Sequence, residues 1–258
     1  MESVSGLHSL RFPLHHFPCF ARLAIEKTRR HATRSSAKRD APFALPKMKF
    51  ESLYRLARKF RQKRMQQFLQ LCVPTPAMTI LDVGGFSGFW IESGASAQIT
   101  ILRPEGPENL PEGCPSNIRS IAGDGCDLHE HADHSFDMVF SNSVIEHVGD
   151  AGRQQAFARE AMRVGKSVWM QTPAHAFPIE PHLLTPFYHW LPAAMQERLF
   201  RWTVWGLISR PRPTLEDYHM HTRARLLSRR EVQAWFPGST ILTERFCGLP
   251  KSYVAYRK

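Results

Sequence analysis

Ile80-Leu81-Asp82-Val83-Gly84-Gly85-Phe86-Ser87-Gly88-Phe89-Trp90 is the stretch of this 258-residue chain that decides its fold. An apolar, β-branched run ends in an acidic residue, three glycines follow within five positions, and an apolar pattern then resumes. This order predicts a strand, a tight loop and the start of a helix. Glycines let a backbone approach a ligand, and a helix start offers free N–H groups to polar or anionic atoms. The loop is therefore a candidate ligand cradle in an α/β sheet, although such turns also occur purely for packing.

Composition favours one main domain with a basic leader. Hydrophobic residues make up 43% of the chain, which is enough for a sizeable core. The formal net charge is +11, but residues 1–47 alone hold nine Lys and Arg against three acidic residues. We expect residues 1–47 to be a disordered basic segment before a domain at 48–258, with an organellar transit peptide or a true start at Met48 as alternatives. The domain itself is only mildly basic.

The cysteines and the hydropathy pattern limit the cellular setting. Five widely spaced cysteines form no CxxC pair and no zinc-like cluster, so we expect reduced thiols, a cytoplasmic compartment and no bound metal. No apolar run approaches the roughly 18–20 residues that span a bilayer. Peripheral contact with a membrane or nucleic acid through the basic N-terminal segment stays open.

An amphipathic helix is predicted from Phe50 to Cys72, before the first strand. Its apolar residues recur at helical spacing, and basic residues fill the other positions: Arg55, Arg58, Lys59, Arg61, Lys63 and Arg64. We expect a solvated basic face. Binding to RNA or anionic lipid is the alternative.

Strands and helices alternate after the glycine loop. A helix is expected from Phe89 to Ala95, and further strands at 97–102, 118–122, 135–141 and 166–171, with a helical pattern from Ser143 to Val164. This alternation indicates a doubly wound, Rossmann-like, mostly parallel sheet of seven strands. Thr240 to Phe246 and Ser252 to Tyr256 are joined by a short loop, which predicts a closing antiparallel hairpin.

Residues 174–222 interrupt this alternation of strands and helices. The segment is rich in proline and aromatic residues and has a helical pattern from about Leu191 to Ile208. We expect an aromatic-rich helical insertion that packs over the carboxyl edge of the sheet. Ser228 and Glu231 form a capping-box pattern that predicts the start of the next helix.

Three signals in this order resemble class I S-adenosylmethionine-dependent methyltransferases, closest to the "type 11" small-molecule group, over about residues 50–258. They are the glycine loop after Asp82, the acidic turn Gly123-Asp124-Gly125, and the string Phe136-Asp137-Met138-Val139-Phe140-Ser141-Asn142-Ser143-Val144-Ile145-Glu146-His147-Val148. The closing hairpin agrees with them. The resemblance implies S-adenosyl-L-methionine as the cofactor.

The resemblance also implies where the cofactor binds. Around the methionine half it places Asp82, Gly84, Gly85, Ser87 and Gly88. Asp124 would accept a hydrogen bond from the adenine amino group, with Gly125 beside the ring. Ser141 and Asn142 would lie under the sulfonium, where the acceptor arrives.

The chain departs from the family pattern at two positions. Phe86 replaces the middle glycine of the loop, so its backbone must avoid a positive φ. The second strand ends in Leu102-Arg103 instead of the acidic residue that grips the ribose, and Glu105 is the nearest acid. We expect Glu105 to take that role. A degenerate fold that binds a nucleotide or a partner without catalysis is the alternative that these departures favour.

The candidate catalytic residues come from two Glu-His pairs. Glu146-His147 follows the fourth strand, and Glu180-Pro181-His182 lies in the aromatic insertion. Methyl transfer to a hydroxyl or amine requires loss of a proton, which His182, His147 or Glu146 could accept. Such pairs can also merely brace loops. The leading interpretation is a methyltransferase acting on a small-molecule acceptor, lipid-like or glycosylated, and an RNA methyltransferase is the alternative.

Overall fold

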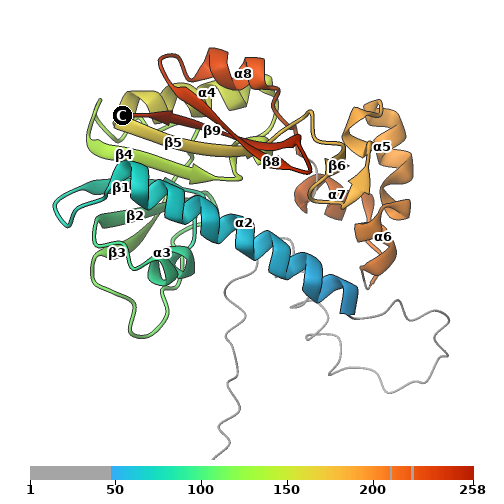
Figure 1. Cartoon of the computed structure of the whole chain (residues 1–258), viewed down its shortest axis with the longest axis horizontal. Coiled ribbons are helices and arrows are strands. Elements are labelled where there is room, and N and C mark those ends of the chain that lie inside the picture. The colour runs from blue at the N-terminus through green and yellow to red at the C-terminus, as the bar shows by residue number, and fades with distance from the viewer. Residues whose placement is uncertain (1–47, 210, 222–223) are drawn as a thin grey trace, which may run out of the picture.

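A seven-stranded sheet forms the centre of the protein (Figure 1). This computed structural model describes residues 48–209, 211–221 and 224–258. The strand order is β3-β2-β1-β4-β5-β9-β8. The strands are β1 (Thr79–Val83), β2 (Gln98–Arg103), β3 (Ile118–Ala122), β4 (Phe136–Asn142), β5 (Gly165–Pro173), β8 (Thr240–Phe246) and β9 (Leu249–Arg257). The first five are parallel, and β9 pairs antiparallel with both β5 and β8. The predicted doubly wound sheet and closing hairpin are confirmed.

Helices cover both faces of the sheet. On one face α2 (Met48–Cys72) and α3 (Ser87–Ser93) pack over a core that includes Phe68, Trp90, Phe140 and Trp169. On the other face α4 (Ala151–Val164) and α8 (Arg229–Trp235) cover a second core around Phe157. Figure 1 shows α2 running obliquely across the sheet. Both faces are therefore closed by apolar packing, as a parallel sheet requires.

Phe68 links α2 to the sheet. It is fully buried, and its ring lies edge-on to three aromatic rings: Trp90, Phe140 and Trp169, at centroid distances of 5.9, 4.9 and 5.4 Å. Aromatic rings in this geometry attract beyond their buried area. This contact fixes the helix that carries Arg64.

The insertion after β5 has a small core of its own. It contains β6 (Ile179–Glu180), β7 (Thr185–Pro186), η3 (Tyr188–Trp190), α5 (Ala193–Leu199), η4 (Phe200–Trp202), α6 (Val204–Ile208) and α7 (Leu215–His221). That core consists of the buried side chains of Leu183, Tyr188, Phe200 and Tyr218. Figure 1 shows it beyond the end of the sheet at which β5 finishes.

Two helical predictions need correction. The pattern at 191–208 is not one helix, because Thr203 takes an extended conformation and caps α6 through the Gly206 N–H. The pattern from Ser143 begins with the short 3-10 helix η2 (Ile145–His147), and α4 starts only after Asp150, whose side chain accepts from the Arg153 N–H. The capping box of Ser228 and Glu231 is confirmed.

Three further expectations concern the thiols, membrane-spanning helices and residues 1–47. Cys72, Cys114, Cys126 and Cys247 are free thiols. Within the described ranges no helix is long and apolar enough to cross a membrane. The prediction for residues 1–47 lies outside the described residues.

Candidate active site

The glycine loop holds a conformation that its glycines require. Gly84 has φ +77°, and a Cβ atom there would lie 2.6 Å from a methyl group of Val144. A Cβ at Gly85 would overlap the Asp82 carboxylate. Phe86 has φ −141°, an extended conformation open to any residue, so the missing middle glycine causes no backbone strain.

The Asp82 carboxylate packs against this loop at Gly85. Its side chain is 1% exposed, and Oδ2 accepts a hydrogen bond from Trp90 Nε1 at 2.6 Å. Burial raises the pKa of the Asp82 carboxyl to about 7, against the lowering effect of the Trp90 hydrogen bond. These contacts support a role for Asp82 in organising the loop.

Glu108 holds the other end of the loop, a contact that the sequence did not reveal. Its carboxylate accepts from the Ser87 N–H at 2.8 Å and from Ser87 Oγ at 3.0 Å. The Glu108 N–H in turn donates to Ser120 Oγ on β3. The predicted residue, Glu105, instead has a side chain that is 65% exposed and pairs with Arg103. Only proximity to β2 favoured Glu105, and the loop that follows β2 brings Glu108 back to Ser87.

Arg103 meets Phe86 at the same end of the sheet. The guanidinium carbon lies 4.4 Å from the centroid of the Phe86 ring. This cation–π contact joins the two positions at which the chain departs from the family pattern.

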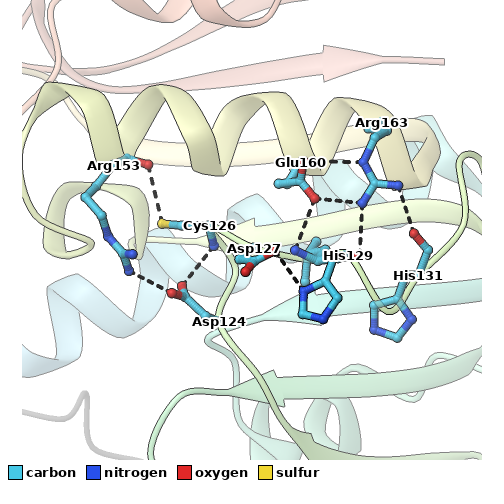
Figure 2. A network of polar contacts seen from close by, with 9 residues as sticks. Asp124, Cys126, Asp127, His129, His131, Arg153, Glu160 and Arg163 are labelled. Carbon is cyan, nitrogen blue, oxygen red and sulfur yellow. Dashed lines mark hydrogen bonds and ion pairs between the residues drawn. The ribbon is translucent and has the colours of Figure 1, made fainter.

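Asp124 faces α4 across the end of β3 (Figure 2). Its Oδ1 accepts from the Cys126 N–H, and its Oδ2 pairs with Arg153 at 2.9 Å. These two donors outweigh desolvation and lower the pKa of the carboxyl. Asp124 is therefore an ionised, partly exposed acceptor. Gly125 packs beside it, where a Cβ would meet Val83 and Phe157.

Ser141 and Asn142 end β4 in different environments. Ser141 is fully buried, and its hydroxyl donates to the Val83 carbonyl oxygen at 3.0 Å, which ties β4 to β1. The Asn142 side-chain oxygen accepts from Arg64. Asn142 thus belongs to a network that extends to α2.

Arg64 is the centre of that network, and its burial differs from what we expected. We expected it on a solvated basic face, but it is 5% exposed. Its Nε and Nη2 atoms donate to the two carboxylate oxygens of Glu244 on β8 at 2.8 and 2.7 Å, and Nη1 donates to Gln171 at 2.7 Å. The burial of Arg64 could not be predicted from helical spacing. In a sequence, an arginine of a buried ion pair cannot be distinguished from an arginine on the surface.

The two predicted Glu-His pairs come together in space. Glu146 and His147 lie in η2, after β4, and His182 lies in the loop between β6 and β7. His147 Nε2 and His182 Nε2 are 3.0 Å apart, and one carboxylate oxygen of Glu146 lies within 4.8 Å of ring nitrogens of both. We call these three residues the Glu-His-His cluster.

Outer contacts fix the Glu-His-His cluster. His182 Nδ1 is 2.7 Å from Glu180 Oε1, and the other Glu180 oxygen accepts from the Leu183 N–H. Thr172, near the end of β5, donates through Oγ1 to Glu146 Oε2 at 3.0 Å. The sequence suggested each pair separately, but it carried no signal that one would contact the other.

Burial perturbs the titration of this cluster. Burial raises the pKa of Glu146 to about 7, although His182 and the Thr172 hydrogen bond act against the rise. Burial by itself lowers the pKa of His182, but the hydrogen bond to Glu180 and the charges of Glu180 and Glu146 outweigh it, so the net shift is upward. Perturbed groups that gather at one place are a mark of functional sites.

All these groups lie at one edge of the sheet. The glycine loop follows β1, Asp124 follows β3, and the Glu-His-His cluster follows β4 and meets the end of β5. Ligands of open α/β sheets bind outside the carboxyl ends of the strands. The predicted cofactor-binding and catalytic residues therefore border one region.

Comparison with known proteins agrees with this arrangement. Residues 95–167 match the family model described as "Methyltransferase domain". Magnesium protoporphyrin IX methyltransferase (ChlM) of Synechocystis PCC 6803, solved with bound SAH, is similar in structure with a TM-score of 0.51 at 11% identity. The alignment covers 92% of this chain and 95% of ChlM.

Other similarities are weaker. An S-adenosylmethionine-dependent methyltransferase of Archaeoglobus fulgidus gives a TM-score of 0.48 at 12% identity, over 76% of this chain and 94% of that one. The [4+2]-cyclase SpnF gives 0.37 at 15% identity, over 46% of this chain, which spans about half of SpnF (49%). The comparison with curated proteins finds no matching sequence.

The chain has the fold of class I S-adenosylmethionine-dependent methyltransferases, and residues 95–167 match a methyltransferase-domain family model. The sheet order and the antiparallel closing strands confirm the predicted fold class and architecture, and the family match agrees with them. S-adenosylmethionine is the cofactor that defines this class.

Proposed function

We propose that the protein transfers a methyl group from S-adenosylmethionine to a hydroxyl or amine of a small-molecule or lipid-like acceptor. The observation that carries this proposal is the meeting of Glu146, His147 and His182 at the carboxyl edge of the sheet, beside the glycine loop. Folding alone does not explain a buried group of acids and bases at this place, because burying charged groups costs free energy.

The residues of the cofactor region fit the cofactor. Gly84 presents backbone in a conformation that only glycine adopts easily, and the ionised Asp124 offers an acceptor to an amino group. Glu108, Ser87 and the Arg103–Phe86 contact would border the ribose, in place of the predicted Glu105. Bound S-adenosylmethionine supplies an electrophilic methyl group on a sulfonium.

The chain's own task is to orient the acceptor and to promote loss of its proton. In-line displacement demands close alignment of the reacting atoms, and general base assistance contributes typically 10²–10⁴-fold. The Glu-His-His cluster promotes the proton loss. Glu180 positions His182, and Thr172 positions Glu146.

The insertion supports an apolar acceptor. Four large apolar side chains are exposed on it: Phe187 and Trp190, which follow His182 closely in sequence, and Trp202 and Leu207 further along. The ring centroids of Phe187 and Trp190 lie 5.3 Å apart, and contiguous exposed apolar surface is typical of contacts with a ligand, a membrane or a partner. We therefore favour a small-molecule or lipid-like acceptor over RNA. A cytoplasmic location with peripheral membrane contact is compatible with that choice.

Labelled methyl transfer tests this function. The full-length chain is incubated with methyl-labelled S-adenosylmethionine and cell extract separated into lipid, small-molecule and RNA fractions. We expect label in the lipid or small-molecule fraction, and its loss with His182→Gln. Label in RNA alone would overturn the acceptor assignment, and binding of the cofactor without label in any fraction would favour the non-catalytic alternative.

A further inference from the structure

The spacing of the Glu-His-His cluster fits the inner ligands of a metal ion. Zinc–nitrogen bonds are about 2.0–2.1 Å long, so two ring nitrogens bound to one ion lie about 2.8–3.4 Å apart for angles of about 90–110°. The Nε2 atoms of His147 and His182 are 3.0 Å apart. A carboxylate oxygen of Glu146 lies within 4.8 Å of both histidines' ligand atoms. Two imidazoles and one carboxylate are the donor set of several catalytic metal sites.

Glu180 prepares His182 for such a role. The contact from His182 Nδ1 to Glu180 Oε1, at 2.7 Å, is best made with the proton on Nδ1, because the carboxylate only accepts. That tautomer leaves a lone pair on Nε2, the atom that faces His147. A carboxylate behind a ligating histidine is the usual outer contact of metal sites.

Glu146 gives evidence for a bound cation that does not depend on the spacing of the histidine nitrogens. The residue is 1% exposed, and its Oε2 accepts from Thr172 while Oε1 is buried and has no hydrogen-bond partner. A buried carboxylate oxygen without a partner costs free energy, and a cation would satisfy it. The unsatisfied group belongs to the same three residues as the paired nitrogens.

We propose that Glu146, His147 and His182 bind one divalent transition-metal ion of the zinc class, with a coordination position left open for the acceptor. The sequence led us to expect no metal, because its cysteines form no CxxC pair and no zinc-like cluster. Through such an ion, the Glu-His-His cluster would promote loss of the acceptor's proton. To that extent the inference deepens the proposed function.

Metal binding by the full-length chain tests the site. The protein is stripped with EDTA, dialysed, and titrated calorimetrically with ZnCl₂ in the absence of S-adenosylmethionine and acceptor. Wild type should bind one equivalent tightly. Glu146→Gln and His182→Gln should each weaken that binding by more than about tenfold, and Glu180→Gln by about 10–100-fold, as outer contacts do.

The matched control is His189→Gln, which removes a histidine of the same insertion whose Nε2 contacts the His175 carbonyl oxygen and which is not part of the cluster. It should leave zinc affinity unchanged. Variants are needed because residues 1–47 also contain histidines and Cys19. Zinc-edge X-ray absorption of wild type, which should show two imidazoles and no sulfur, keeps the test valid if a variant fails to fold.

The outcomes are separable. No zinc bound by wild type, sulfur in the zinc shell, or equal affinity in His182→Gln and wild type would each overturn the metal site. Because the titration needs no methyl transfer, an inactive protein that binds zinc would leave the metal site standing and contradict only the proposed function.

Discussion

His147 Nε2 and His182 Nε2 lie 3.0 Å apart although 35 positions separate the residues in sequence. One comes from the segment after β4 and the other from the insertion after β5. The contact joins the insertion to the carboxyl edge of the sheet and brings acids and bases together there. The proposed function depends on this contact between the two histidines.

Removal of His182 should abolish most activity. We expect His182→Gln to lower kcat by about 10²-fold or more, because the cluster then loses the group that joins Glu180 to His147. Steady-state rates with the acceptor found in the labelled fractions measure this. His189→Gln, the control in the same insertion, should retain activity, and an equal loss in both variants would assign the effect to the insertion's folding instead.

Glu108, and not Glu105, should support cofactor binding. Glu108→Gln weakens the two contacts to Ser87, and charge-assisted hydrogen bonds contribute about 1.5–3 kcal/mol. We therefore expect calorimetry to show S-adenosylmethionine affinity lowered by about tenfold or more. Glu105→Gln changes an exposed side chain and should leave the affinity near that of wild type. The reverse ranking of the two variants would restore the original prediction for Glu105.

The Arg64–Glu244 pair should be important for stability. Arg64→Leu leaves Glu244 without its partner and removes the donor to Asn142 and Gln171, which should cost about 3–5 kcal/mol in the free energy of unfolding. Urea denaturation measures this. Arg58 on the same helix forms an exposed pair with Glu92, and Arg58→Leu should cost about 1 kcal/mol or less. Similar costs for the two would show that Arg64 is not held as described.

Asp82 should make stability depend on pH. Its pKa rises from 3.8 to about 7 on folding, so the folded state binds a proton that the unfolded state lacks between these values. The free energy of unfolding of wild type should therefore fall, relative to Asp82→Asn, as pH rises from about 4 to about 7, and change little outside that window. Urea unfolding of both proteins across this range gives the difference. A constant difference would mean that Asp82 is ionised throughout.

The sequence predicted the sheet well because its strands are local signals. The buried run of β4, the β8–β9 hairpin and the Ser228–Glu231 capping box are each encoded by residues that are near one another in sequence. The site was harder to predict. Its glycine loop and both Glu-His pairs were recognisable, but contacts between distant segments were not.

Three residues illustrate that limit. Glu108 reaches Ser87 only because an irregular loop turns back, Arg64 is charged yet buried, and His182 meets His147 through the packing of an insertion. Periodicity and spacing describe one segment at a time. Pairings of this kind are set by tertiary structure, which overrides the local pattern.

Cofactor binding by the full-length chain tests the central claim most directly. Calorimetric titration of the EDTA-treated protein with S-adenosylmethionine should give saturable binding at one site, weakened by Asp124→Ala, which removes the carboxylate beside Cys126 and Arg153. Absence of any binding by a chain that unfolds cooperatively, and is therefore folded, would contradict the assignment of a methyltransferase and leave only its fold.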